Sequence, residues 1–488
     1  IALTLLITYA NLYLSPLPYI WSTNDVNYLA SVALCSNYAV LGYVNMNSAP
    51  GQFQRFLIIN LRTGHTITIH PSLVINASLL PPQMVVDCNN NVLYIVYTCV
   101  GWNNIFNNNV VGLCLTKVNA SNGMVMDQYF LSSVYGNKSV IKYMDLSAGL
   151  VYGIINDSVY VFPQFIGTYK ANGINRFNQP EYTAINMTCS GLVRILIKEN
   201  GTLGIAWETP MHPCMPGFRC SDGRCSPMVN VINNYVVVIY YEDFNNTGTS
   251  HVRLILINDS NGAVIYGTNI IGISSVLSST MIGNTLVYPC GASLCGMEVM
   301  SNGTRLRFMI NGLSGTVFSV GDHGLVLTQN YNGVSIVRIG GNGSIIGSMS
   351  IPINLRVELS EFCSSLDFLH LMSNGIALLT VYPCGISYGV YDYRESLAII
   401  NITKGSVIHQ IVRILKIPII NTPDPSSIFP TAIPIASNNE YIAYYFNNQL
   451  FITNEVQLIN DWWYYVLFDN MYLVTALWVI ILIIVIIV

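Results

Sequence analysis

Short apolar runs and polar turns alternate along almost the whole chain. The stretch Leu254–Tyr266 is representative: Leu254–Ile257 is entirely Leu and Ile, Asn258–Gly262 is polar and ends in Gly, and apolar residues then resume. Ile, Val and Leu suit a strand buried between sheets, whereas Asn, Asp, Ser and Gly suit a tight reversal. The pattern therefore predicts a β-hairpin.

The same phrase recurs through the sequence. Full copies span Leu57–Gly64, Thr116–Gly123 and Ala398–Gly405. Shorter copies end at Gly201, Gly303 and Gly343, with a degenerate copy near Gly167. The spacing of these marker glycines centres on the length of a four-stranded propeller blade, about 40 to 50 residues. The longer separations contain visible insertions, and the shorter ones do not.

The repeat resembles the blades of quinoprotein-like and WD-type β-propellers. The resemblance implies an all-β fold with a single β-propeller over residues 24–460. We expect eight blades, with seven as the alternative because the segment around Gly201 is weakly patterned. Because propellers carry unrelated functions, the resemblance says nearly nothing about chemistry.

Both ends of the chain are apolar. Residues 1–23 are interpreted as an outer strand that closes the last blade, with a signal-peptide-like or membrane-associated segment as alternatives. In Met471–Val488, Thr475 is the only clearly polar residue. A helix of that length would span about 27 Å. Residues 461–488 are therefore predicted to be a transmembrane anchor rather than a buried strand or assembly helix. Aromatic residues would form its interfacial belt: Trp462, Trp463, Tyr464, Tyr465 and Trp478.

Composition indicates an exported protein. Only 9% of the residues are charged, against about 25% in typical soluble domains. The net charge of −4 argues against nucleic acid as a partner, since such partners require a basic face. The chain has twelve cysteines, which in an oxidising compartment would form disulfides. Cys88 with Cys99, Cys290 with Cys295, and Cys220 with Cys225 or Cys189 with Cys214 are possible pairs, although sequence does not fix connectivity. The candidates are Cys88, Cys99, Cys189, Cys214, Cys220, Cys225, Cys290, Cys295, Cys363 and Cys384.

Eleven Asn-x-Ser/Thr sequons predict glycosylation, many of them on expected turns. The alternative is that a chain rich in Asn, Ser and Thr produces sequons by chance. The low charge and the sequons together resemble envelope proteins of thermoacidophilic archaea or their viruses. The sequon asparagines are Asn76, Asn119, Asn137, Asn156, Asn186, Asn200, Asn245, Asn258, Asn302, Asn342 and Asn401.

Few residues suggest catalysis or cofactor binding. The irregular segment Trp207–Met228 contains Cys214, Cys220 and Cys225, which we interpret as a disulfide-tied loop in preference to a copper or zinc site. His323 follows Asp322 and is interpreted as a turn residue. The Gly385-x-Ser387-x-Gly389 spacing matches a nucleophile elbow, but we expect it between two strands, where that elbow does not form. We expect no cofactor, catalytic residue or metal.

These features favour a membrane-anchored extracellular glycoprotein on a cell or virion membrane. Its propeller would act in recognition, adhesion or envelope assembly, with lipid and a protein or glycan as partners. A surface-bound propeller enzyme, either a hydrolase or a quinoprotein-type oxidoreductase using the central funnel, is the alternative. A copper-dependent electron-transfer subunit is a third hypothesis. The low charge favours the surface-recognition hypothesis, since an enzyme would need a cluster of acidic, basic or histidine side chains in the funnel.

Overall fold

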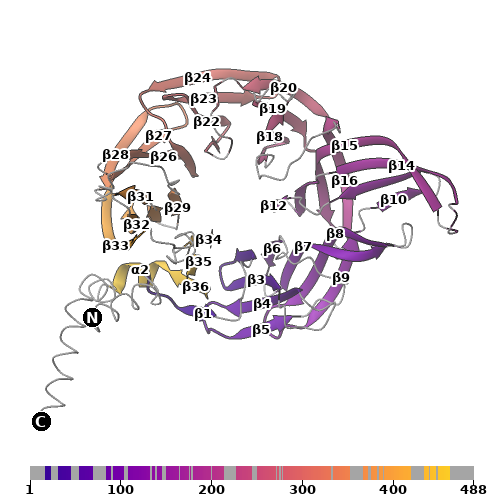
Figure 1. Ribbon diagram of the computed structural model, residues 1–488, viewed down its shortest axis with the longest axis horizontal. Helices are drawn as coiled ribbons and strands as arrows, with labels where there is room; N and C mark the ends of the chain where they lie inside the picture. Colours follow the sequence, from indigo (N-terminus) through magenta and orange to yellow (C-terminus); the bar gives the residue numbers. More distant parts are fainter. Residues whose placement is uncertain are drawn as a thin grey trace, which may run out of the picture. The chain divides into compact units, whose positions relative to one another are not determined.

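A computed structural model shows an all-β protein whose strands form eight antiparallel sheets (Figure 1). The fold is an eight-bladed β-propeller, which confirms the predicted architecture. The chain divides into two compact units, Ala30–Val326 with Arg338–Ile346, and Ile1–Leu29 with Leu327–Val337 and Gly347–Val488. The structure describes residues 17–23, 31–44, 54–69, 84–89, 92–103, 108–131, 134–137, 140–145, 150–155, 157–163, 165–174, 176, 178, 180–198, 200–213, 227–243, 250–270, 272, 273, 276, 278–330, 333–351, 367–371, 375–381, 384–387, 390–418, 433–438, 440–446 and 449–461.

Blades 1, 2, 4 and 5 are simple four-stranded meanders in the larger unit. Each runs in chain order across its sheet, because short polar turns join strands whose apolar residues are buried on both faces. Their strands are β2 (Ser31–Leu34), β3 (Tyr38–Val44), β4 (Gln54–Asn60) and β5 (Thr66–Ile69); β6 (Met84–Asn89), β7 (Val92–Asn103), β8 (Asn108–Asn119) and β9 (Val125–Leu131); β17 (Met228–Ile232), β18 (Tyr235–Asp243), β19 (Ser250–Asn258) and β20 (Val264–Ile270); β21 (Thr280–Ile282), β22 (Thr285–Cys290), β23 (Ser293–Met300) and β24 (Gly303–Asn311).

Blade 3 carries an insertion. Its four blade strands are β12 (Leu150–Ile155), β13 (Ser158–Phe162), β15 (Pro180–Ile197) and β16 (Leu203–Pro213). The first half of the long β15 pairs with β14 (Phe165–Ile174), whereas its second half pairs with β13. The insertion also includes β10 (Val134–Asn137) and β11 (Val140–Asp145), and it extends away from blades 2 and 4 (Figure 1).

Blade 6 has residues in both units and consists of β25 (Thr316–Val320), β26 (His323–Asn330), β27 (Gly333–Gly340) and β28 (Ile345–Ile351). Blade 7 lies in the smaller unit and is formed by β29 (Asp367–Leu371), β30 (Ile376–Val381), β32 (Val390–Asn401) and β33 (Ser406–Pro418). A short strand, β31 (Cys384–Ser387), pairs antiparallel with β32. Ser387 therefore lies in a β-hairpin, as predicted, and not at a strand–helix elbow.

Blade 8 joins the two ends of the described chain. Its sheet contains β34 (Ile433–Ser437), β35 (Tyr441–Phe446) and β36 (Gln449–Asn454), and β1 (Trp21–Thr23) pairs with β36 as the edge strand. The Tyr444 hydroxyl donates a 3.0 Å hydrogen bond to the Leu17 carbonyl, which ties the N-terminal segment into the same core. The helix α2 (Glu455–Asn460) follows, with Asn454 as its N-cap.

The cores lie between successive sheets of each unit. Between blades 1 and 2, for example, Phe56 of β4 packs edge-to-face on Tyr97 of β7, with ring centroids 4.7 Å apart. Equivalent apolar clusters join blades 2 and 3, blades 3 and 4, and blades 4 and 5. Both faces of an inner strand are therefore buried, which explains why the predicted strands occur as continuous apolar runs.

Two expectations about the repeat are wrong. Gly167 is not a turn glycine, because it lies inside β14 and pairs with Met187 of β15. Trp207–Pro213, which its prolines indicate as irregular, is the second half of β16. Proline is tolerated there because β16 is an edge strand, paired on one side only.

Candidate binding surface at the outer turns

One structural feature is repeated in blades 1 to 7: the turn that joins the third and fourth strands. We call these the outer turns. Six of their glycines adopt left-handed φ values between 65° and 84°. Glycine adopts this conformation without steric cost. In blades 1, 2 and 4 the glycine N–H donates a 2.8 Å hydrogen bond to the Asn carbonyl four residues earlier. The outer turns end at Gly64, Gly123, Gly201, Gly262, Gly303, Gly343 and Gly405.

Each outer turn from blade 2 onward lies against the fourth strand of the preceding blade. An added Cβ at Gly262 of blade 4 would be 2.9 Å from Trp207 of blade 3, and one at Gly201 would be 3.1 Å from the Asp127 carboxylate. The supporting side chain differs at every junction, while the glycine does not. The supporting residues, in order, are Ile67, Asp127, Trp207, Tyr266, Phe308 and Met349.

Six of the seven outer turns contain a sequon asparagine. In four of them the Asn Oδ1 accepts hydrogen bonds from both the N–H and the hydroxyl of the sequon Ser or Thr. At Asn258 these bonds measure 2.9 and 2.8 Å. This Asx turn uses the amide oxygen, so the amide Nδ2, the atom to which a glycan attaches, takes no part in these hydrogen bonds. Turn formation by itself also selects this residue pattern. The six asparagines are Asn119, Asn200, Asn258, Asn302, Asn342 and Asn401.

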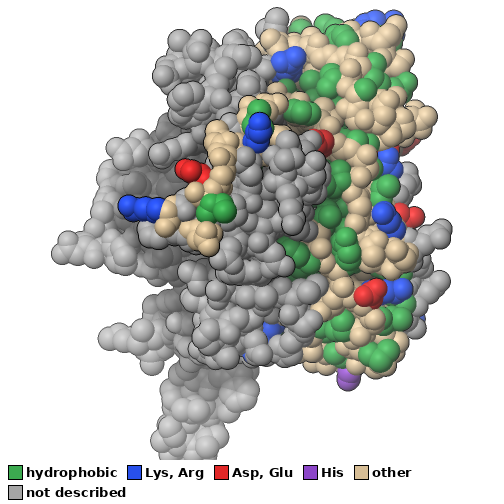
Figure 2. All heavy atoms as spheres, turned by 90° about the vertical axis from the view of Figure 1, so that its right-hand side faces the viewer, with side chains coloured by type: hydrophobic (Ala, Val, Ile, Leu, Met, Phe, Trp, Pro, Cys, Tyr) green, Lys and Arg blue, Asp and Glu red, His purple; other side chains and the backbone are tan. Residues whose placement is uncertain are grey.

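The fourth strands expose apolar side chains just after the outer turns. Met124 is 55% exposed, Val264 52% and Ile345 58%. One side of the molecule shows scattered hydrophobic side chains among uncharged polar ones, with single Lys, Arg, Asp and Glu side chains between them (Figure 2).

An ion pair joins blades 3 and 4 at one outer turn. Arg194 of β15 contacts the Asp259 carboxylate at 3.2 Å, and both side chains are mostly buried. Trp207 Nε1 donates a 2.6 Å hydrogen bond to the Asp259 carbonyl, and the Tyr160 hydroxyl donates one of 2.7 Å to Asp259 Oδ1. Burial and the adjacent carboxylate raise the pKa of Tyr160, so this hydroxyl remains protonated. These contacts fix the blade 4 turn onto blade 3.

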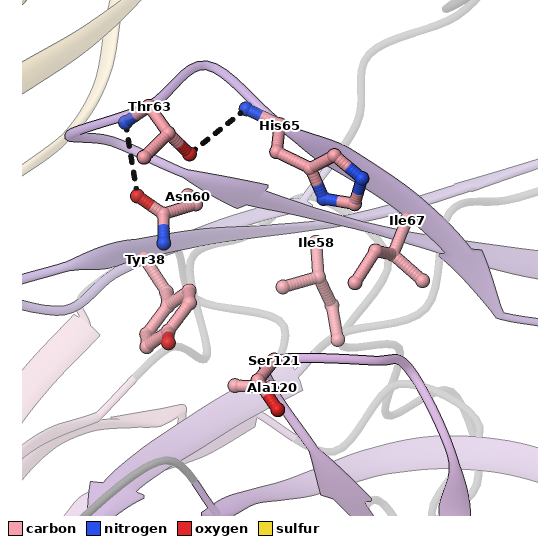
Figure 3. A pocket seen from close by; sticks show the side chains of 8 residues that line it. All are labelled: Tyr38, Ile58, Asn60, Thr63, His65, Ile67, Ala120 and Ser121. Atoms are coloured by element: carbon pink, nitrogen blue, oxygen red, sulfur yellow. Dashed lines mark hydrogen bonds between the residues drawn. The ribbon is translucent and has the colours of Figure 1, made fainter.

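A cavity of about 290 Å³ lies at the corresponding junction of blades 1 and 2 (Figure 3). We call it the Tyr38 cavity. Figure 3 shows the blade 1 hairpin on one side and the blade 2 turn on the other. Its eight lining residues are Tyr38, Ile58, Asn60, Thr63, His65, Ile67, Ala120 and Ser121.

Strand register shows that the ion pair and the cavity occupy equivalent places in the repeat. Ile58 pairs with Ile67 in blade 1, as Arg194 pairs with Trp207 in blade 3. Ala120 follows the turn asparagine of blade 2, as Asp259 follows that of blade 4. Large polar or aromatic side chains therefore fill one junction, whereas two Ile and an Ala leave the other hollow.

Three disulfides are described, all in the larger unit. Cys290 bonds Cys295 across the β22–β23 hairpin, which is one of the predicted pairs. The Cys88–Cys99 pairing is wrong: Cys88 bonds Cys35 of blade 1, and Cys99 bonds Cys114 within blade 2. The sequence could not reveal the Cys35–Cys88 bond because it joins a turn of blade 1 to a strand of blade 2. These disulfides indicate an oxidising environment.

Several predicted sites fall outside the described residues. They include the aromatic belt and predicted anchor beyond Asp461, the loop cysteines Cys214, Cys220 and Cys225, and the sequons at Asn76, Asn156 and Asn245. Nothing is described for the side chains of Cys189, Cys363, Cys384 and Asn137; Asn186 is exposed on β15. Among the described residues, no helix is long and apolar enough to cross a bilayer.

The described part of the chain also contains no group of three His, Cys, Asp or Glu residues placed to hold a metal ion. His323 begins β26 directly after a turn, and its Nδ1 contacts the Asp322 carboxylate. Sequence reasoning missed both the Arg194–Asp259 pair and the Tyr38 cavity. Arg194 offered one signal, since it is the only charged residue in the apolar run Leu192–Ile197.

Comparisons with known proteins find propellers of varied function. BamB from Moraxella catarrhalis is 10% identical with a TM-score of 0.34, covering 74% of this chain and 96% of that one. The Swd1 β-propeller domain of Myceliophteria thermophila is 11% identical with a TM-score of 0.30, covering 79% of this chain and 96% of that one. The polysaccharide lyase Uly1 is 8% identical with a TM-score of 0.35, covering 84% of this chain and 95% of that one. No protein-family model and no curated protein matches the chain. Similarity this low carries no argument about function.

Proposed function

We propose that this protein is an exported, glycosylated surface protein whose β-propeller recognises a protein or glycan partner, held to a cell or virion membrane by residues 461–488. The observation that carries the proposal is the set of sequons on the outer turns of blades 2 to 7. All six lie in the turn between the third and fourth strands, at one of two positions. Three of the asparagines lie four residues before the turn glycine and three lie directly before it. Glycans there would cover the exposed apolar residues that follow the turns of blades 2, 4 and 6.

The disulfides and the low charge support the same function. Disulfides persist in oxidising compartments, and three are present among the described residues. Uncharged polar turns keep a surface hydrated without ionisable groups. A propeller also presents many loops from a rigid scaffold, which suits recognition.

Two measurements on protein from its native source test the proposal. A membrane-impermeant biotin reagent applied to intact cells or particles should label the protein. Mass spectrometry of peptides that contain Asn258 and Asn342 should show glycan mass on both.

An Asn258→Asp variant supplies the matched control, because aspartate keeps the Oδ1 acceptor of the Asx turn and removes the glycan attachment atom. Its mass should fall by one glycan with no loss of stability. Unmodified turn asparagines in a protein that intact cells or particles shield from the reagent would overturn the proposal.

A further inference from the structure

We propose that the Tyr38 cavity binds a neutral sugar ring. This inference rests on the proposed recognition function and deepens it by naming a ligand class, and it can fail while export and glycosylation hold. The cavity volume is about 290 Å³. This volume admits several waters, and a pyranose with about a dozen heavy atoms falls in the same size class.

The chemistry of the walls suits such a ligand. The half-buried Ile67 and the edge of the Tyr38 ring form the accessible apolar wall, and the almost fully buried Ile58 and Ala120 close the cavity beneath it. One face of a sugar ring presents C–H groups, which pack on aliphatic and aromatic side chains. None of the lining residues is Asp, Glu, Lys or Arg, so a charged ligand would gain no ion pair.

Polar groups at the rim match the hydroxyls around the edge of a sugar. Asn60 Oδ1 accepts hydrogen bonds from the N–H groups of Arg62 and Thr63, which leaves the Asn60 amide as a donor. The Thr63 hydroxyl accepts from the His65 N–H and can donate outward. Ser121 Oγ donates to Asn119, and so offers lone pairs to a ligand hydroxyl. The rim therefore has two donors and one acceptor.

Comparison with another junction of the repeat indicates that the Tyr38 cavity is a feature of this junction and not of the fold in general. At the junction of blades 3 and 4 the same positions hold Arg194, Trp207 and Asp259, and the space is filled. Blade 1 also has the one outer turn among the seven without a sequon, since Asn60 is followed by Leu61 and Arg62. No N-glycan on that turn would block the entrance.

Saturation-transfer NMR on the intact protein, purified from a host that adds no N-glycans, tests the proposal. The probes are methyl glucoside, methyl mannoside and N-acetylglucosamine at millimolar concentration. At least one should receive saturation at its ring protons. An Ile67→Trp variant, which copies the filled junction of blade 3, should weaken that binding about tenfold or more.

The control is Ile265→Trp, the same substitution at an exposed position of β20 that lines no described cavity. It should leave sugar binding unchanged. His65→Ala, a change at an exposed residue, should weaken binding severalfold. Absence of saturation transfer to every probe, or equal transfer in the Ile67→Trp protein, would overturn the proposal.

The sugar could arrive free or as part of the glycan on neighbouring Asn119. Probe binding to glycosylated wild type and to a glycosylated Asn119→Asp variant distinguishes these two sources. If probes bind glycosylated wild type and Asn119→Asp equally, the site takes a free saccharide. If they bind only the Asn119→Asp protein, the chain's own glycan occupies the cavity. Both results support the proposed chemistry.

Discussion

The contact between each outer turn and the preceding blade predicts a specific difference between two Gly→Ala substitutions. Gly262 has φ +73°, and an added Cβ would lie 2.9 Å from three Trp207 atoms. Gly64 has φ +71°, yet nothing lies within 4 Å of its added Cβ. Alanine would therefore be strained by the same φ at both positions, and the two differ only in whether a side chain of the neighbouring blade lies close to the added Cβ.

The backbone strain of a left-handed alanine costs about 1 to 2 kcal/mol, and this cost applies to both variants. Loss of chain entropy in the unfolded state is also the same for both, so it cancels in the comparison. Gly262→Ala adds overpacking, about 1 to 3 kcal/mol in a well-packed interior. Trp207 cannot move away freely because its Nε1 is hydrogen-bonded to the Asp259 carbonyl at 2.6 Å. We expect Gly262→Ala to lower the free energy of unfolding by about 2 kcal/mol more than Gly64→Ala.

Urea unfolding followed by tryptophan fluorescence measures both variants, with midpoints compared because a chain of this size can unfold in more than one step. A double-mutant cycle locates the cause. In a Trp207→Gly background all three contacting side-chain atoms, Cβ included, are absent. There Gly262→Ala should cost no more than Gly64→Ala. Equal destabilisation of the two single variants would refute the inter-blade contact as the source of the effect.

Two further predictions concern buried polar groups. Asp259→Asn leaves the mostly buried Arg194 without its ion partner and should cost about 2 kcal/mol by the same assay. By contrast, Glu298→Gln, at an ion pair whose arginine is largely exposed, should cost nothing measurable. Burial raises the pKa of Tyr97 to about 12. Unfolded Tyr97 ionises near pH 10, so its contribution is complete below pH 10 and is lost as the pH rises towards 12, about 3 kcal/mol in all. Tyr97→Phe should therefore flatten the stability curve between pH 10 and 12, and an unchanged slope would contradict this assignment.

The strands and turns of the repeat could be predicted because local chemistry determines them. The apolar runs and the polar turn predict a hairpin over Leu254–Tyr266, and β19 and β20 form it. A tight reversal requires a glycine with positive φ, so Gly123 and Gly262 marked their turns correctly. Gly167 fitted the spacing but not the structure, because spacing alone does not distinguish a turn from a glycine inside a strand.

The junctions between blades could not be predicted, because they depend on strand register. That Ile58 and Arg194 occupy equivalent places follows only from their pairing with Ile67 and Trp207. A shift of one residue in either hairpin would turn each side chain to the opposite face of its sheet. Trp207 was further obscured by the prolines that follow it, which suggested a loop where an edge strand lies.

The contrast between constant turns and variable junctions indicates where function can arise in this fold. The outer-turn glycines are restricted by backbone geometry, and six of the seven share one left-handed conformation. The side chains beneath them are restricted only by the volume to be filled, and a tryptophan with an ion pair fills it in blade 3. At the junction of blades 1 and 2, Ile67 and Ala120 leave the volume open without disturbing the turn hydrogen bonds. A repeat of this kind can therefore gain a binding site by shortening a few side chains at one junction, while the other junctions maintain the fold.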